Sequence, residues 1–178
     1  LISKKEKYLY DKAKVPSVVF GPQRFYNNWI LEIEEYFSNH SKANSIKNLV
    51  RNKSAALVIL KNRSGPLHEI FSENQRFQYK QKLFQSLIDN GFYLIIKPHP
   101  AENHKLLNNE IKNLNEDQYI ISELPAAYLA TLCKCAVFEF PSNSVMDVLA
   151  AKKPSYFPIV EIIKMIPDFY NKDILGEL

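Results

Sequence analysis

Two short motifs carry side chains that could bind a phosphorylated ligand. Lys97 and His99 stand among prolines in the stretch LIIKPHP, directly after an apolar run. Ser142, Asn143 and Ser144 stand in FPSNSVMD, again directly after an apolar run. An ammonium group, an imidazole and small hydroxyl side chains can hydrogen-bond phosphate oxygens, and an imidazole can also transfer a proton to one. The two motifs together therefore predict a phosphate site.

Each motif also has a purely structural interpretation. Pro98 and Pro100 would force an extended exit from a strand, and His99 would then be a hydrogen-bonded surface residue. Ser142 or Asn143 would be the N-cap of a helix that has no ligand, although free N–H groups at such a helix start also bind anions. A ligand site is favoured if both motifs lie at the same edge of one sheet.

Hydrophobic periodicity indicates the elements that would bring the motifs together. Continuous apolar runs, each followed by a segment with helical spacing, are typical of a parallel sheet covered on both faces. We therefore expect an α/β fold, with a Rossmann-like domain over residues 55–178. The expected strands are residues 55–60, 92–97, 118–122, 135–140 and 154–159, and the expected helices are residues 73–91, 103–115, 125–133 and 142–153.

The helix expected at residues 73–91 has an apolar stripe and a clear end. Asn90 and Gly91 are typical of a helix C-terminus. The stripe consists of Phe77, Leu83, Phe84, Leu87 and Ile88.

Residues 1–54 fit the repeat less well, and we expect them to form an interdomain or linker segment. Within them, residues 15–21 indicate a strand, residues 25–40 an amphipathic helix, and residues 41–53 a linker or a polar helix. Aromatic side chains crowd the first thirty positions, where they either pack in the core or form an interface with another protein.

Further candidate ligand contacts follow the expected strands, because ligands of open parallel sheets bind at the carboxyl ends of the strands. Glu139 lies in an apolar strand, so it either faces a ligand at the strand tip or pairs with a buried cation such as a lysine. Asp147 either complements a helix dipole or reaches a ribose hydroxyl. The remaining candidates are Arg63 and Ser64, in a loop that could also be merely solvated, and Glu123, which could be only the first residue of a helix.

Composition narrows the class of protein. A net charge of +4 is spread along the chain, which does not favour nucleic acid as a partner. Cys133 and Cys135 are the only cysteines and are too few for a structural zinc site, so we expect reduced thiols and no metal. No stretch approaches about 18 consecutive apolar residues, and no export signal is seen. We therefore expect a cytoplasmic protein, for which the inner face of the membrane is one place to act.

The pairing of IIKPHP with FEFPSNSVMDVLAAKKPSYFP resembles the C-terminal, donor-binding half of bacterial transferases with the GT-B fold. Similar families are the CDP-glycerol glycerophosphotransferases of teichoic acid synthesis, the bacterial sialyltransferases and related capsule glycosyltransferases. The segment VVFGPQRFYNNW is similar to a GxPRF…W segment near the junction of the two domains in some of these enzymes.

The resemblance implies a role for each matched residue. His99 would contact or protonate the donor phosphate, Lys97 would add positive charge, Ser142 and Ser144 would bind the phosphate together with the helix N-terminus, and Asp147 would approach the ribose. The family's adjacent serine pair is here split by Asn143.

The resemblance also implies the partners. The donor would be a nucleotide-activated sugar, with a slight preference for a CMP- or CDP-linked one, and no cofactor or metal would be required. An N-terminal acceptor-binding domain would supply the general base, so we expect this chain alone to bind a nucleotide but to turn over poorly. The full-length protein could contact the membrane peripherally.

Three other functions stay open at this point. One is a CDP-polyol phosphotransferase of the teichoic acid type, and another is an enzyme similar to the UDP-sugar 2-epimerases, which would need several acid and base groups in the cleft. The third is a non-catalytic Rossmann-like module that binds a protein through its aromatic N-terminal segment.

Overall fold

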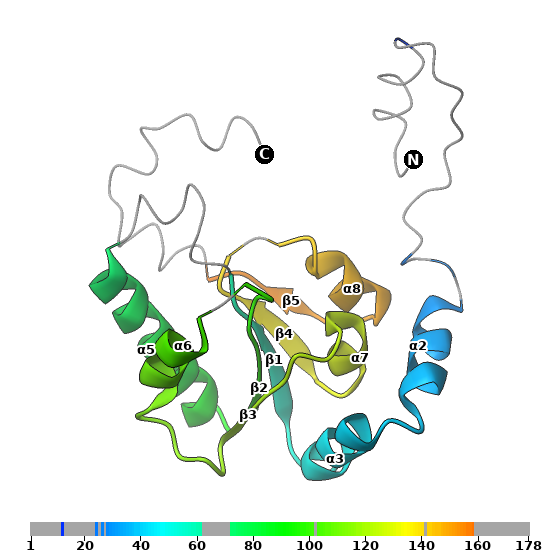
Figure 1. The fold of residues 1–178 in the computed structure, drawn as a ribbon, viewed down its shortest axis with the longest axis horizontal. Coiled ribbons are helices and arrows are strands. Elements are labelled where there is room, and N and C mark those ends of the chain that lie inside the picture. The colour runs from blue at the N-terminus through cyan, green and yellow to red at the C-terminus, as the bar shows by residue number, and fades with distance from the viewer. Residues whose placement is uncertain are drawn as a thin grey trace.

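The structure of the chain is a computed structural model that describes residues 28–61, 72–101, 103–140 and 142–158, together with Lys12, Arg24 and Tyr26 (Figure 1). The expected strand at residues 15–21 lies outside the described residues, as do Arg63 and Ser64. The helices are α2 (Trp29–Phe37), α3 (Ser41–Val50), α5 (Glu73–Asp89), α6 (His104–Ile111), α7 (Ala126–Thr131) and α8 (Val145–Ala150). The strands are β1 (Ala55–Ile59), β2 (Tyr93–Lys97), β3 (Tyr119–Ile121), β4 (Cys135–Phe138) and β5 (Ser155–Tyr156).

The strands form one five-stranded sheet in the order β3-β2-β1-β4-β5, and every pair is parallel. In the middle of the sheet, Leu57 of β1 is in register with Ile95 of β2 and with Ala136 of β4. All residues of β1 and β4 are buried, as their continuous apolar runs predict for strands covered on both faces. The predicted Rossmann-like α/β fold is therefore confirmed.

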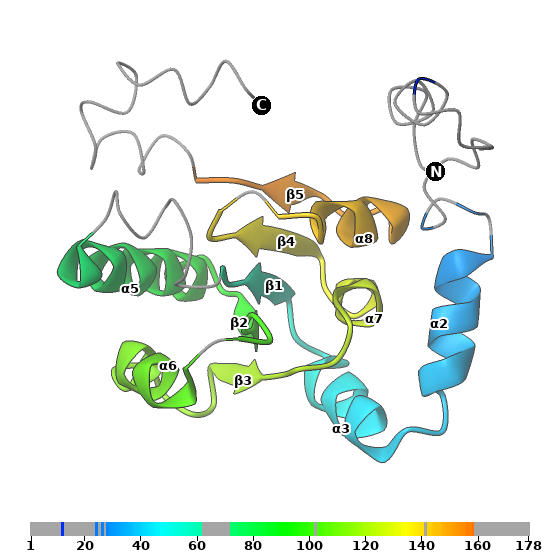
Figure 2. The ribbon, with the colours of Figure 1, turned by 45° about the horizontal axis from the view of Figure 1, so that its top comes forward.

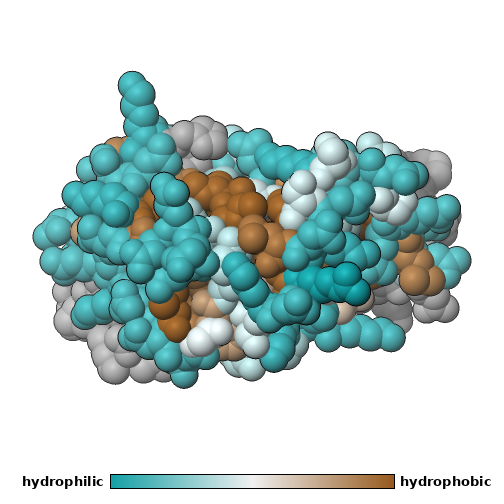
Figure 3. Space-filling model, turned by 90° about the horizontal axis from the view of Figure 1, so that it is seen from below, coloured by the Kyte–Doolittle hydropathy of each residue, from teal (hydrophilic) through white to brown (hydrophobic). Residues whose placement is uncertain are grey.

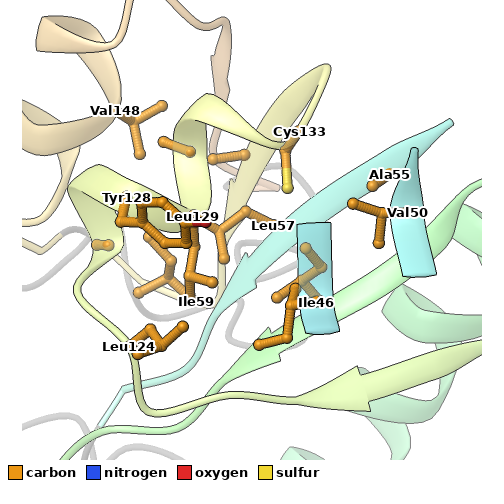
Figure 4. Close-up of a cluster of buried hydrophobic side chains, with 14 of the residues drawn as sticks. Ile46, Val50, Ala55, Leu57, Ile59, Leu124, Tyr128, Leu129, Cys133 and Val148 are labelled. Atoms are coloured by element: carbon orange, nitrogen blue, oxygen red, sulfur yellow. The ribbon is translucent and has the colours of Figure 1, made fainter. Parts of the chain in front are cut away.

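Helices cover the two faces of the sheet in separate groups (Figures 1 and 2). Because alternate strand residues point to opposite faces, Leu57 packs with the α3, α7 and α8 side while Val58 packs with the α5 and α6 side. Figure 4 shows the first of these clusters, in which Ile46 of α3 and Leu129 of α7 meet Leu57. Phe84 of α5 belongs to the second cluster.

The sequence left open whether residues 41–53 form a linker or a polar helix. Most of them form the helix α3. Its polar face looks outward, whereas Ala43, Ile46 and Val50 are buried in the same core as the strands. His40 caps this helix, since its Nδ1 accepts a hydrogen bond from the Ala43 N–H at 3.3 Å.

The helix α5 begins and ends as its sequence predicts, but its buried face differs from the expected stripe. A capping box joins Ser72 and Gln75 at its start, and Gly91 ends it with a positive φ of 77°. Phe84 is buried, whereas the other four residues of the stripe are only half-buried. Two cationic residues that hydropathy would place in water, Arg76 and Lys80, are buried instead.

Figure 3 shows the molecule from below, relative to the view of Figure 1. This face is mainly hydrophilic, with an apolar area in its middle. Among the described residues, no helix has the length and apolar character that would be needed to cross a membrane.

Candidate phosphate-binding site

A pocket of about 560 Å³ opens at the carboxyl ends of the central strands. It is lined by residues 59–61 at the end of β1, residues 97–100 at the end of β2, and residues 142–144 before α8. From β1 the chain adds β2 and β3 on one side of the sheet and then β4 and β5 on the other side. The strand order therefore reverses next to β1, where the pocket lies. Ligands of open parallel sheets bind in the crevice at such a point.

The structure thus brings together the two motifs that the sequence singled out. Lys97 and His99 share the pocket wall with Ser142, Asn143 and Ser144. Their placement at one edge of the sheet follows from the parallel pairing of β1 with both β2 and β4. Their role in binding a ligand stays a prediction.

His99 has one ring nitrogen engaged by the main chain. Its Nδ1 accepts a hydrogen bond from the Ala101 N–H at 3.1 Å, within the tight turn that follows Pro98. An accepting Nδ1 carries no proton, so the neutral imidazole carries its proton on Nε2. His99 is therefore prepared to donate a hydrogen bond from Nε2. To act as a proton donor it would first have to be protonated on Nδ1 as well, which would break the bond from the Ala101 N–H.

Lys97 is the last residue of β2 and is half-buried at the pocket wall. Burial lowers the pKa of its ammonium group, while the carboxylates of Glu123 and Asp147 oppose this change. The charge is thus incompletely hydrated, which strengthens its attraction to an anion that enters the pocket. Glu123 itself is exposed beyond β3 and is not among the residues that line the pocket.

The turn before α8 differs from the prediction. Ser144, not Ser142 or Asn143, is the N-cap residue, and α8 has only six residues. The Ser142 hydroxyl instead accepts a hydrogen bond from the Ser144 N–H at 3.3 Å, and the carbonyls of Ser142 and Asn143 accept from the N–H groups of Val145 and Met146. Local carbonyls and hydroxyls therefore occupy the N–H groups that were expected to face an anion. The side chains of this turn that can still donate are the hydroxyls of Ser142 and Ser144 and the amide of Asn143.

Arg24 is a residue at this site that the sequence did not single out, although it lies in the quoted segment GPQRF. Its Nε lies 3.0 Å from Oδ1 of Asp147, and its Nη1 donates a hydrogen bond to the Asn143 carbonyl at 3.1 Å. Burial raises the pKa of Asp147, whereas Arg24 and Lys97 oppose this change. Asp147 is not among the pocket-lining residues. The structure pairs it with Arg24 instead.

Glu139 shows the second of its two predicted alternatives, a buried pair with cations. It is fully buried, and its Oε1 lies 3.3 Å from Nη2 of Arg76 and 3.5 Å from Nζ of Lys80. Lys80 also pairs with Glu110 at 2.8 Å. Glu139 does not line the pocket, so its interpretation as a direct ligand contact is not supported by this arrangement. The hydrophobic periodicity of the strand could not reveal this network of ion pairs, because its other members lie on α5 and α6.

Comparisons with known proteins add no family. No protein-family model matches the chain, and no curated protein sequence matches it either. Within the part of the chain that the structure describes, no group of three histidine, cysteine or acidic side chains could hold a metal ion.

Proposed function

We propose that the pocket binds the phosphate of a nucleotide-activated sugar and that the chain is the donor-binding domain of a glycosyltransferase of bacterial surface polysaccharide synthesis. The observation that carries this proposal is the meeting of Lys97, His99 and the serine turn in one pocket. Its volume of about 560 Å³ suits a ligand of nucleotide size. A CMP- or CDP-linked donor is preferred, because the families with similar motifs use cytidine nucleotides.

The chemistry of the proposed reaction is a displacement at the anomeric carbon of the sugar. The bond between that carbon and a phosphate oxygen breaks, and a bond to the acceptor oxygen forms while the acceptor proton passes to a base on another domain. Negative charge then develops on the leaving phosphate, so donors fixed around it stabilise the transition state.

Four side chains of the pocket donate to the phosphate in this proposal. Lys97, the last residue of β2, supplies a cationic charge that is incompletely hydrated, so it neutralises the phosphate strongly. His99 donates a hydrogen bond from Nε2 as a neutral imidazole, since its Nδ1 is held as an acceptor. The hydroxyls of Ser142 and Ser144 donate to the remaining oxygens. The mechanism therefore uses His99 as a fixed hydrogen-bond donor rather than as a proton donor.

Two substitutions of His99 test the proposal. His99→Gln can place an amide N–H near the position of Nε2, whereas His99→Asn keeps an acceptor for the Ala101 N–H but loses the distal donor. Loss of a hydrogen bond to a charged group costs about 1.5–3 kcal/mol, so His99→Asn should weaken CDP binding about 10- to 100-fold in calorimetric titration. His99→Gln should retain most of the affinity.

His40→Asn is the matched control, because His40 also accepts a backbone N–H through Nδ1 but does not line the pocket. It should leave the affinity unchanged. Failure of the wild-type chain to bind CMP, CDP, UMP and UDP would refute the proposal, and equal losses in both His99 variants would refute the donor role of Nε2.

A further inference from the structure

A network of buried charges adjoins the pocket between α5, α6 and β4. Lys80 and Glu139 are fully buried, and Arg76 and Glu110 are only 6% and 4% exposed. Lys80 lies between the two carboxylates, and Arg76 contacts Glu139. Two positive and two negative charges thus balance one another away from water.

Glu139 uses its two carboxylate oxygens differently. Its Oε1 faces the cations and accepts hydrogen bonds from Nε and Nη2 of Arg76, both at 3.3 Å. Its Oε2 accepts a hydrogen bond from the main-chain N–H of Lys61 at 2.7 Å. A bond of this length between a carboxylate and an N–H group is charge-assisted and strong.

Arg76 also binds the main chain of Lys61, through the carbonyl group of that residue. Its Nη2 donates a hydrogen bond to the Lys61 carbonyl at 3.2 Å. Lys61 lies beyond the last residue of β1, Ile59, and it lines the pocket. One buried ion pair therefore fixes both the N–H and the carbonyl of a residue in the pocket wall.

We propose that Glu139, together with Arg76, is a positioning residue that fixes the Lys61 main chain at the pocket wall. Stability alone does not require such a pair, because apolar side chains of similar volume often replace a buried ion pair without loss. Apolar side chains could not, however, hydrogen-bond to the partly buried main-chain N–H and carbonyl groups of Lys61. A wall that is already ordered lowers the entropic cost of ligand binding. The effect on the ligand rests on the proposed function, whereas the fixation of Lys61 does not.

Two matched substitutions test this role. Glu139→Asp and Glu110→Asp each keep the charge and remove one methylene from a buried carboxylate of the same network. Glu139 accepts a hydrogen bond from the Lys61 N–H, whereas Glu110 pairs with Lys80. Glu139→Asp should speed hydrogen exchange of the Lys61 amide at least about tenfold beyond any change in global stability, and should weaken CDP binding by a similar factor. Glu110→Asp should change both by less than about twofold.

The outcomes separate this inference from the proposed function. Equal effects of the two substitutions on the Lys61 amide, or none with Glu139→Asp, would overturn the positioning role. If the wild-type chain binds no CDP, the proposed function fails while the amide exchange still decides the role of Glu139. If Glu139→Asp does not fold, the hydrogen exchange of the Lys61 amide in the wild-type chain decides. Strong protection of this amide, which lies outside any strand, supports the positioning role. Exchange at the rate of an unstructured peptide overturns it.

Discussion

Replacing Lys80 by methionine should destabilise the protein severely. The Lys80 side chain is fully buried and lies 2.8 Å from Glu110 and 3.5 Å from Glu139. Methionine fills a similar volume but leaves the buried network with one uncompensated negative charge. Removing one partner of a buried ion pair costs about 3–5 kcal/mol, which is a large part of the roughly 5–15 kcal/mol that stabilises a typical domain.

A second substitution separates this charge effect from a loss of packing. Lys80→Met combined with Glu110→Gln restores neutrality, so the double variant should lie within about 2 kcal/mol of the wild type. The two substitutions should therefore couple by at least about 2 kcal/mol rather than add.

Urea unfolding followed by circular dichroism at pH 7 measures these free energies. Salt at about 0.5 M should change the coupling little, because buried pairs are poorly screened. A loss below about 1 kcal/mol for Lys80→Met would refute the buried network, and so would a double variant that is as unstable as the two single losses added together.

Three further predictions concern the pocket, the thiols and the core. The pKa of Lys97 is lowered in the folded state, so its charge costs stability at neutral pH, and this cost disappears as the pH rises to 10.5. Lys97→Met should therefore raise the free energy of unfolding in urea at pH 7 but not above pH 10.5. The same substitution should weaken CDP binding about tenfold. An unchanged affinity would contradict the role of Lys97. Burial raises the pKa of Cys133 to about 12, so this thiol should resist a disulfide reagent at pH 8 until urea unfolds the protein; rapid labelling of the native chain would contradict its burial. Ile46→Ala should cost about 2–4 kcal/mol in urea unfolding, whereas Leu49→Ala, at a residue 40% exposed on the same helix, should cost less than about 1 kcal/mol; equal losses would show that α3 is not part of the core.

The central sheet could be predicted from the sequence because its signal is local. The run AALVIL is apolar at every position, and the structure buries it between helices on both faces. Parallel order then placed His99 and Ser142 at one edge without any knowledge of contacts. Whether a long, strongly patterned segment forms a helix or a strand depends on residues that are close in the sequence, so it can be predicted from the sequence alone.

The missed features depend on partners far away in the chain. Arg76 and Lys80 look like solvent-exposed residues of α5, and only the carboxylates of Glu139 and Glu110 explain their burial. The contact of Arg24 with Asp147 joins segments that no local pattern connects. Such pairings are fixed by tertiary packing, which overrides hydropathy at single positions.

The serine turn shows a different limit. Serine and asparagine before a helix predict a cap, but these side chains also bond to main-chain groups two residues away. In this chain Ser142 bonds to the Ser144 N–H, which moves the N-cap to Ser144 and removes free N–H groups from the proposed phosphate site. The sequence could predict a polar turn, but it could not decide which hydrogen bonds the turn would make.

A titration of isotope-labelled chain with CDP, followed by NMR, tests the proposed phosphate site most directly. The account predicts that saturable shifts concentrate on the amides of Lys61, Lys97, His99 and the residues 142–144, and that the proton on Nε2 of His99 becomes observable as it bonds to the phosphate. Saturable shifts confined to another surface, or no saturable shifts with any cytidine or uridine nucleotide, would contradict it.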